Sequence, residues 1–220
     1  MNAYIFDLDG TLFESMDVWA KVDKEFFQKR GLALPEEHAR ATIAMHIDEA
    51  ADYIKKLFGL QESAEDIIQE WLSIAEAAYE TDVRLKPHAK EYLQKLSAAG
   101  HKLAVATSLP EELLEPALHK HGIYHIFHAI STAREVGSGK AKPDIFVLAA
   151  KKLGVAPEDC LLFDDILQAV KSAKSIGMKV CAVYDKSSRH DWDEIKATAD
   201  YAITCFKDAW DLILPPLSRV

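Results

Sequence analysis

Two carboxylates, Asp7 and Asp9, follow directly after a short apolar run that ends at Phe6. The run is rich in strand-forming residues, so we expect a buried strand that delivers both acids into a turn. Residues two apart in an extended chain point to the same side, so both carboxylates can face one small volume. Gly10 then lets the backbone pass close to whatever they hold. An ordinary Asp-Gly turn after a strand would give the same stretch, so the interpretation depends on residues further along the chain.

Three later apolar stretches also end in polar residues that can do chemistry. The second stretch is followed by Thr107 and Ser108, the third by Lys140, and the fourth by Asp164 and Asp165. In an open parallel sheet, ligands bind outside the carboxyl ends of the strands. We therefore expect all four groups to gather at one edge of a sheet.

The acidic residues suit an attack on a phosphate monoester. Asp7 would be the nucleophile, while Asp9 would protonate the leaving alcohol and later activate water against the aspartyl-phosphate. A negatively charged nucleophile must approach a dianion, so the repulsion between them has to be offset. A divalent cation held by Asp7, Asp165 and a backbone carbonyl in the Asp9 region would do this, because hard cations take oxygen ligands.

The other polar residues would bind the phosphoryl group. Lys140 would add a fixed positive charge, and the hydroxyls and backbone amides at Thr107 and Ser108 would bind the equatorial oxygens. Taken singly, each group has a bland explanation: a solvated lysine, the start of a turn, or, for Asp164 and Asp165, a helix cap. The order of all four groups at successive strand ends is what favours a single site.

Helices and strands alternate after Pro87, and they are the elements expected to position these residues. The expected helices are 88–99, 111–121, 144–153 and 167–176, and the expected strands are 103–106, 129–131, 161–163, 179–183 and 201–203, with a terminal helix after the last strand. This alternation predicts an α/β fold with a doubly wound parallel sheet.

Residues 14–84 carry only helical signals. Three apolar stripes at helical spacing run through 18–26, 43–54 and 67–75. Gly59 is expected to end the second helix, and Ser63 to cap the third together with Asp66. We therefore expect an α-helical domain over residues 14–84, inserted into an α/β core made of residues 1–13 and 85–220.

Composition narrows the class of protein. The chain has 220 residues and a formal net charge of −9, which argues against a nucleic-acid-binding surface. No apolar run approaches the length of a membrane span, and the N-terminus enters a strand without room for a signal peptide. We expect a cytoplasmic protein with a small-molecule substrate. Its oligomeric state, monomer or dimer, stays open.

The motifs resemble those of the haloacid dehalogenase superfamily. The resemblance rests on Asp7-Leu-Asp9-Gly10-Thr11, Thr107, Gly139-Lys140 ahead of Pro143-Asp144, and Asp164-Asp165. The helical insertion after the first motif is similar to the cap of the phosphoglycolate phosphatase and β-phosphoglucomutase branch. The resemblance implies a Rossmann-like core, a mobile cap and a magnesium cofactor.

The same resemblance implies a role for each motif residue. The nucleophile would be Asp7, and Asp9 would be the general acid and base. Thr107 would bind phosphate and Lys140 would stabilise it, although Lys142 is a rival because the spacing of the third motif departs from the usual one. The implied metal ligands are Asp7 and Asp165, a backbone carbonyl in the Asp9 region, and Asp164 as a second ligand or an outer partner.

The reaction and its substrate are less defined. The second acid of the first motif favours phosphate-ester chemistry, and Trp19 stands about where sugar-phosphate mutases of this branch carry a His, so we expect a phosphatase with a β-phosphoglucomutase-like mutase as the alternative. A phosphorylation-controlled binding module of the receiver type is a further alternative, but its motif order differs. Substrate choice should lie in the cap, where Met16, Trp19, His46 and Asp48 are the candidates.

Four histidines, His119, His121, His125 and His128, form a second cluster. Imidazole is a common ligand of transition metals. Gly122 breaks the helix between the two halves of the cluster, and carboxylates are not concentrated there, so a solvated surface is the favoured interpretation.

Overall fold

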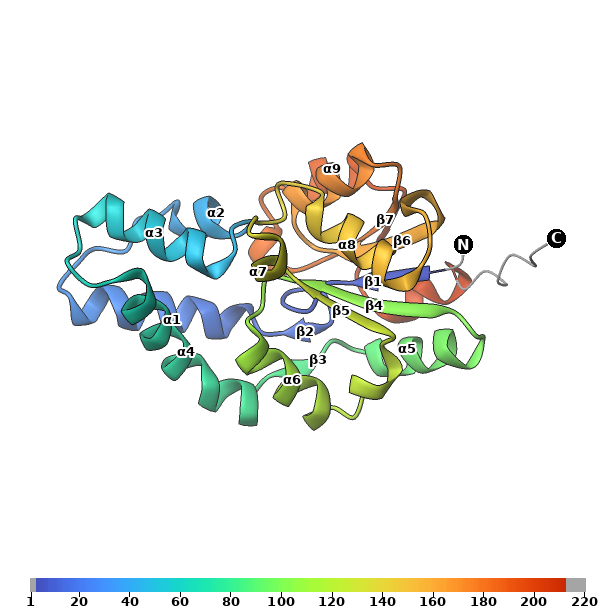
Figure 1. Cartoon of the computed structure of the whole chain (residues 1–220), viewed down its shortest axis with the longest axis horizontal. Helices are drawn as coiled ribbons and strands as arrows, with labels where there is room; N and C mark the ends of the chain where they lie inside the picture. Colours follow the sequence, from blue (N-terminus) through green and yellow to red (C-terminus); the bar gives the residue numbers. More distant parts are fainter. Residues whose placement is uncertain (1–2, 213–220) are drawn as a thin grey trace.

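The computed structural model describes residues 3–212, and its centre is a six-stranded parallel sheet with the order β5-β4-β1-β6-β7-β8 (Figure 1). The strands are β1 Ala3–Phe6, β4 Lys102–Thr107, β5 Ala129–Thr132, β6 Cys160–Asp164, β7 Lys179–Val183 and β8 Tyr201–Ile203. β1 lies between β4 and β6, paired in parallel with both. The predicted α/β class with a doubly wound parallel sheet is confirmed.

Helices cover both faces of the sheet. They are α5 Ala89–Ala98, α6 Glu111–Lys120, α7 Ala133–Val136, α8 Asp144–Leu153, α9 Leu167–Ser175 and α10 Trp192–Thr198, and Figure 1 shows α8 and α9 above the sheet with α5 and α6 below it. Successive strand residues serve opposite layers: Ile5 packs in the apolar cluster of α8 and α9, and Phe6 in the cluster of α5 and α6. This alternation fixes which residues of each strand face which layer.

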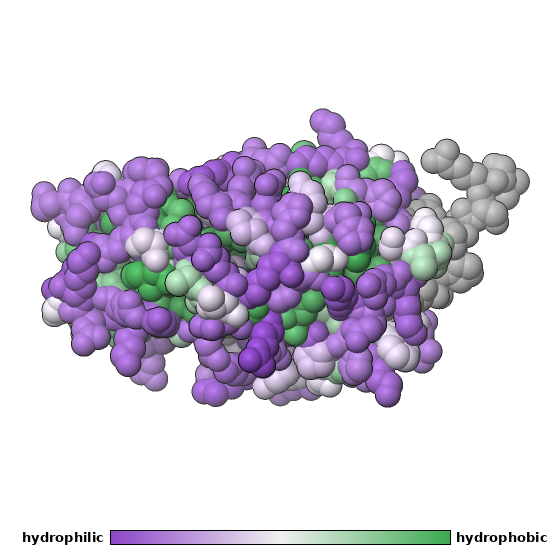
Figure 2. All heavy atoms as spheres, turned by 90° about the horizontal axis from the view of Figure 1, so that it is seen from below, coloured by the Kyte–Doolittle hydropathy of each residue, from purple (hydrophilic) through white to green (hydrophobic). Residues whose placement is uncertain are grey.

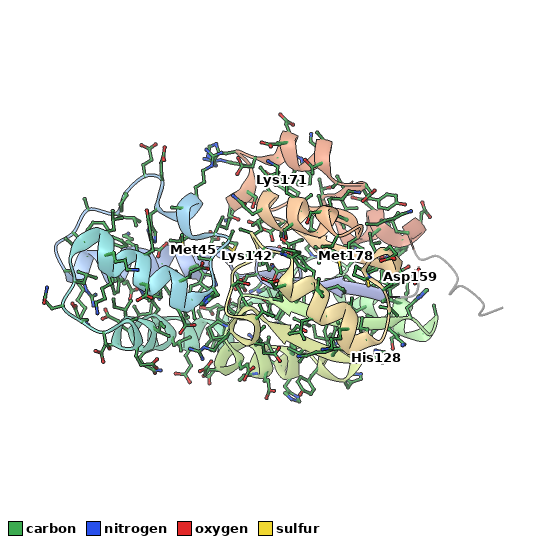
Figure 3. All side chains as sticks on the ribbon, turned by 45° about the horizontal axis from the view of Figure 1, so that its top comes forward. Met45, His128, Lys142, Asp159, Lys171 and Met178 are labelled. Atoms are coloured by element: carbon green, nitrogen blue, oxygen red, sulfur yellow. The ribbon has the colours of Figure 1, made fainter. Side chains whose placement is uncertain are left out.

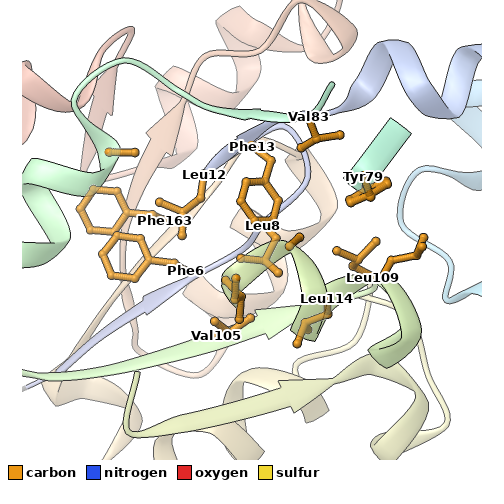
Figure 4. Packing of buried hydrophobic residues seen from close by; sticks show 14 of the residues in the cluster. Phe6, Leu8, Leu12, Phe13, Tyr79, Val83, Val105, Leu109, Leu114 and Phe163 are labelled. Carbon is orange, nitrogen blue, oxygen red and sulfur yellow. The ribbon is translucent and has the colours of Figure 1, made fainter. Parts of the chain in front are cut away.

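The larger of these clusters, which contains Phe6, packs β1 against β6 and against the residues that follow β1. Phe6 stacks on Phe163 of β6 with ring centroids 4.7 Å apart. Figure 4 shows Leu12 and Phe13 continuing the same packing beyond the end of β1. The loop that carries Asp7 and Asp9 is therefore fixed by buried apolar side chains on both sides.

Four helices form the inserted unit: α1 Met16–Lys29, α2 His38–Thr42, α3 Ile47–Phe58 and α4 Ala64–Thr81. The predicted caps are present, since Gly59 ends α3 in the left-handed conformation and Ser63 forms a capping box with Asp66 at the start of α4. Two short strands, β2 Phe13–Glu14 and β3 Arg84–Leu85, pair antiparallel and connect this unit to the sheet. They lie at the predicted boundaries between the helical domain and the core. The division of the chain into these two domains stays a prediction.

The structure corrects two details of the expected elements. The predicted second helix is interrupted, because α2 ends at Thr42 and α3 begins at Ile47. The backbone between them is used elsewhere: the Ala44 carbonyl accepts a hydrogen bond of 2.8 Å from the backbone N–H of Lys140. The expected terminal helix is a 3₁₀ segment over Phe206–Leu212, and its continuation lies outside the described residues.

Polar side chains cover most of the face shown in Figure 2, and apolar residues appear there only in small patches. None of the helices within residues 3–212 is long and apolar enough to cross a membrane.

Candidate active site

Lys140 is the lysine that the fold brings to the acidic residues. Its Nζ lies 2.6 Å from Oδ1 of Asp7 and 2.8 Å from Oδ2 of Asp164, and only 2% of the residue is exposed. Lys142 is exposed on the surface of the core, near Met45 of the cap (Figure 3). The geometry thus separates the two rivals and places Lys140 beside the predicted nucleophile.

Three buried carboxylates, from Asp7, Asp164 and Asp165, form a group that could hold a metal ion. Each offers an oxygen, and these oxygens lie within 4.8 Å of one another. Oxygen-only ligand sets suit hard divalent cations. The three acids outnumber the ammonium of Lys140 by two, so a divalent cation would balance the buried charge, and the residues present fit such an ion.

Neighbouring donors fix the two acids at the end of β6. Thr11 Oγ1 donates to Oδ1 of Asp165 at 2.9 Å, and Ser188 Oγ donates to Oδ2 at 3.2 Å. The backbone N–H of Ile166 donates to Oδ1 of Asp164 at 3.1 Å. Thr11 belongs to the first sequence motif, whereas nothing in the sequence singled out Ser188. These bonds hold the carboxylates in place before any ligand arrives.

Burial and the charges of neighbouring groups shift the pKa values of Lys140 and of the acids at the end of β6. Burial raises the pKa of Asp164 to about 6, although Lys140 opposes the shift. Burial and the charges of Asp164 and Asp7 raise the pKa of Asp165 well above its ordinary value. Burial lowers the pKa of Lys140, but the charges of Asp164 and Asp7 outweigh it and hold that pKa above its ordinary value. Lys140 is therefore a permanent cation, and positive charge added beside Asp165 would favour its ionised form.

Gly10 allows the first motif to pass against Asp165. Its φ is +74°, and a Cβ at this position would lie 2.4 Å from Oδ2 of Asp165. Both the backbone conformation and the space exclude a side chain. The approach of the Gly10 backbone to a ligand held by Asp7 and Asp9 stays a prediction.

Asp9 has different partners from Asp7. Its Oδ1 accepts from Ser15 Oγ at 2.6 Å and from Tyr79 Oη at 2.5 Å, and its Oδ2 accepts from Trp19 Nε1 at 2.9 Å. Burial raises the pKa of Asp9, the bonds from Ser15 and Tyr79 oppose this shift, and the charge of Asp7 adds to it. The Asp9 side chain lies outside the acidic group described above, and these three donors bind its oxygens. A metal contact through a backbone carbonyl in this region stays a prediction.

Tyr79 was missed by sequence reasoning because it lies 70 residues from Asp9 in the chain. It stands near the end of α4, where Lys120 of α6 donates to the carbonyls of Tyr79 and Val83. Figure 4 shows Tyr79 beside Val83 and Phe13, close to the two linker strands. The Asp9 carboxylate is thus held by residues of the inserted unit that also contact the core.

Thr107 and Ser108 lie at the end of β4, as expected. Thr107 is buried, and its Oγ1 accepts from the backbone N–H of Leu109 at 3.2 Å. Ser108 Oγ is buried and has no hydrogen-bond partner among the described residues. Buried hydroxyls are normally paired, so the unpaired Ser108 hydroxyl is consistent with a ligand at this position.

A cavity of about 770 Å³ joins these groups to the helical unit. Its walls include Asp7, Asp9 and Lys140 on the core side and Met16 and Trp19 on the cap side. The structure thus brings two of the predicted cap residues to the same space as the acids.

The other two predicted cap residues lie outside the cavity wall. His46 and Asp48 are absent from the described cavity wall, and His46 Nδ1 lies 3.2 Å from Oδ2 of Asp48. The wall instead contains His38, whose Nε2 lies 3.1 Å from Oδ1 of Asp23. His38 is the first residue of α2, a short helix that the sequence pattern did not separate from the next one, so nothing in the sequence singled it out.

A buried ion pair lies between the linker strand β3 and the loop that contacts Asp165. Lys86, directly after β3, lies 3.0 Å from Oδ2 of Asp185, and both side chains are buried. Asp185 also accepts from the backbone N–H and the hydroxyl of Ser187, next to the Ser188 that contacts Asp165. Burial raises the pKa of Asp185, but Lys86 and Ser187 outweigh it and hold the pKa below its ordinary value.

The four histidines of the second cluster do not form a metal site in the described residues. His119 stacks on Tyr124, while His121 Nε2 lies 3.2 Å from the Val83 carbonyl. His128 Nδ1 accepts from the backbone N–H of Leu103.

Comparison with known proteins supports the family resemblance that the sequence motifs indicated. The family model for haloacid dehalogenase-like hydrolases matches residues 4–183. Hexitol phosphatase A from Escherichia coli is 31% identical, over 83% of this chain and 82% of its own. The crystal structure of CbbY from Rhodobacter sphaeroides in complex with phosphate is 26% identical, covers 96% of both chains and has a TM-score of 0.82. β-Phosphoglucomutase from Clostridium difficile shares the fold with a TM-score of 0.82 at 18% identity, over 97% of this chain and 95% of its own.

The predicted family, with its inserted helical unit, therefore agrees with sequence motifs, with fold and with relatives across most of the chain. The chain belongs to the haloacid dehalogenase-like hydrolase family.

Proposed function

We propose that this chain is a magnesium-dependent phosphatase that hydrolyses a small phosphorylated metabolite through a phosphorylated Asp7. The observation that carries the proposal is the position of Asp7. Its carboxylate contacts Lys140, belongs to the buried acidic group and lies in the wall of the same cavity as Asp9. Relatives named as phosphatases of carbohydrates and hexitols support this reaction class.

The first step would transfer the phosphoryl group to Asp7. A divalent cation bound by Asp7, Asp164 and Asp165 supplies charge that offsets the repulsion between the carboxylate and the phosphate dianion. Lys140 holds a second positive charge beside the Asp7 oxygen, and the Thr107 and Ser108 region faces the same cavity, where its donors would bind the phosphoryl oxygens.

Asp9 would handle the protons of both steps. It would first donate a proton to the leaving alcohol, and it would then accept one from the water that attacks the phosphoryl group on Asp7. Burial and the charge of Asp7 raise the pKa of Asp9, which favours the protonated form that a general acid needs. Ser15, Tyr79 and Trp19 fix the direction in which its oxygens point.

The experiment is a measurement of phosphate release from a panel of phosphorylated metabolites, with and without magnesium, and with Asp7→Asn as the blank. We expect release that requires magnesium and is abolished in a folded Asp7→Asn protein. Substantial release by that variant would overturn the nucleophile assignment. Isomerised sugar phosphate without phosphate release would favour the mutase alternative.

The receiver-type binding module is not retained, because the chain matches the hydrolase family and carries an inserted helical unit after β1. We propose the cytoplasm as the compartment, on the composition of the chain. Monomer and dimer remain equally compatible with the proposal.

A further inference from the structure

We infer that the alcohol part of the substrate carries a flat, largely apolar ring system of the kind found in nucleosides, which the cap side of the cavity encloses. The inference rests on the proposed function, because it concerns the leaving group of that reaction. It follows from the size of the cavity, from the character of its cap wall and from the pairing of the charges around it.

The cavity is one continuous space from the acids to the interior of the helical unit. With a volume of about 770 Å³, it falls in the upper part of the range for sites that enclose drug-sized ligands, roughly 300–1,000 Å³. A phosphoryl group held at Asp7 and Lys140 would occupy only its core end. The rest of the space is therefore available to the alcohol that carries the phosphate.

The cap wall is mainly apolar and includes aromatic and thioether side chains. It contains Met16, Trp19, Leu34, Met45, Ile47 and Trp71. Polyol hydroxyls against such a wall would lose hydrogen bonds to water without replacing them, which costs free energy. A flat ring would instead pack against the aromatic and sulfur groups.

Two cations of the wall are already paired with carboxylates. Arg40 pairs with Asp191 at 2.7 Å and Lys186 pairs with Asp17 at 2.7 Å, both across the boundary between the cap and the core. A ligand that drew Arg40 or Lys186 toward itself would have to break one of these pairs, whereas a neutral ring would leave both intact.

Two residues of this wall carry a buried polar atom that has no partner among the described residues. His38 and Trp71 are 5% and 6% exposed, and the Nδ1 of His38 and the Nε1 of Trp71 make no hydrogen bond there. A few unpaired donors and acceptors on an apolar wall are what a heterocycle with polar edge atoms requires. This observation favours a nucleobase-like ring over a plain hydrocarbon ring.

The test compares substrates that differ only in the ring. Uridine 5′-monophosphate and ribose 5-phosphate share the reacting phosphate and its primary alcohol, as do flavin mononucleotide and ribitol 5-phosphate. We expect kcat/KM to be at least about tenfold higher for the ring-bearing member of one pair or both, since even one methylene contributes about that much in an apolar pocket.

A substitution in the cap wall tests whether the ring of the substrate binds there. Met45→Gln keeps the length of the side chain but puts an amide in the wall, whereas Leu57→Gln makes the same kind of change at a position of α3 that is 51% exposed and outside the described wall. Met45→Gln should lower kcat/KM about tenfold for the preferred ring-bearing substrate and about twofold or less for its ring-free partner. Leu57→Gln should change neither.

The outcomes separate this inference from the proposed function. A ratio below tenfold in both pairs, or hydrolysis of other phosphates but of no member of either pair, would overturn the inference and leave the phosphatase proposal standing. Equal losses on both substrates in Met45→Gln would contradict the position assigned to the ring. Absence of magnesium-dependent phosphate release from every compound would overturn the proposed function itself.

Discussion

Asp7 and Asp9 are two residues apart, yet their surroundings suit different roles. Asp7 contacts the cation Lys140, which would stabilise negative charge at the proposed point of attack. Asp9 accepts hydrogen bonds from Ser15, Tyr79 and Trp19. Neighbouring carboxyl groups with such different partners commonly divide the work of nucleophile and proton carrier.

The two lysines of the third motif give the first test at this scale. Lys140→Ala should lower kcat about a hundredfold to a thousandfold, the usual effect of removing one group that stabilises charge in the transition state. Lys142→Ala is the matched control and should stay within about twofold, because Lys142 is exposed. Steady-state kinetics on folded proteins, checked by circular dichroism, would decide. A larger loss in Lys142→Ala would mean that the third motif is wrongly assigned.

Tyr79 gives the second test. Tyr79→Phe removes the hydroxyl that donates to Asp9 at 2.5 Å and keeps the ring in the apolar core. We expect kcat to fall about tenfold with little change in KM, because a misdirected proton carrier slows the reaction without weakening substrate binding. Tyr53→Phe, a half-buried tyrosine of α3, serves as the control. An unchanged kcat, or a rise in KM alone, would remove Tyr79 from the set of positioning residues.

Sequence reasoning could place most of the motif residues because they lie at or directly after strand ends, which meet at one edge of a parallel sheet. Lys140 lies further along the chain, since α7 separates it from β5. The same reasoning could not find Tyr79 or Ser188. Both reach the site through contacts between residues far apart in the chain, and neither belongs to a motif or to a periodic pattern. His38 was missed for a related reason, since its place in the cavity wall depends on the turn between α1 and α2.

The turn between α2 and α3 docks the helical unit onto the core. The Ala44 carbonyl accepts from the backbone N–H of Lys140, and a Cβ on Gly139 would lie 2.1 Å from that carbonyl oxygen. Backbone cannot move aside as a flexible side chain can. Gly139 is therefore required for close approach of the two backbones.

Gly139→Ala tests this docking. The added methyl group should push the turn away from Lys140, and we expect kcat/KM to fall at least about tenfold while the core stays folded. Ala141→Ser, which changes an exposed neighbour, is the control and should have no effect. Activity equal to the wild type in Gly139→Ala would show that the contact between Ala44 and Lys140 is dispensable.

At the scale of elements, the strands and helices of the core were predictable because apolar runs and capping signals are local. The interruption of the second cap helix was not. The stripe of Ile43, Ile47 and Ile54 fits one continuous helix, and only the hydrogen bond from Lys140 to Ala44 explains why the chain leaves the helical path. β2 and β3 were also missed, since two residues are too few to show a pattern.

For the molecule as a whole, repulsion among the buried acids lowers the free energy of unfolding, and a bound metal ion would relieve that repulsion. Added magnesium should raise the free energy of unfolding, by about 2.7 kcal/mol at a concentration a hundred times the dissociation constant. Asp165→Asn should lose most of this gain. In the absence of metal at neutral pH, the same variant should be at least as stable as the wild type, because the pKa of Asp165 is raised in the fold and its ionised form is disfavoured.

Denaturant unfolding with and without magnesium would measure both effects. Asp193→Asn, which changes a carboxylate that is 98% exposed, is the matched control and should keep the full magnesium response. A full response in Asp165→Asn would contradict the assignment of the metal to the buried acidic group.

The central claim is that the phosphoryl group passes through Asp7, and chemical trapping tests it most directly. The enzyme would be mixed with substrate and magnesium, quenched rapidly and treated with borohydride, which reduces an aspartyl-phosphate to homoserine, and the peptide that contains residue 7 would be analysed by mass spectrometry. We expect homoserine at position 7 in the wild type and none in Asp7→Asn. Phosphate release with unmodified Asp7 throughout, or homoserine at another aspartate, would contradict it.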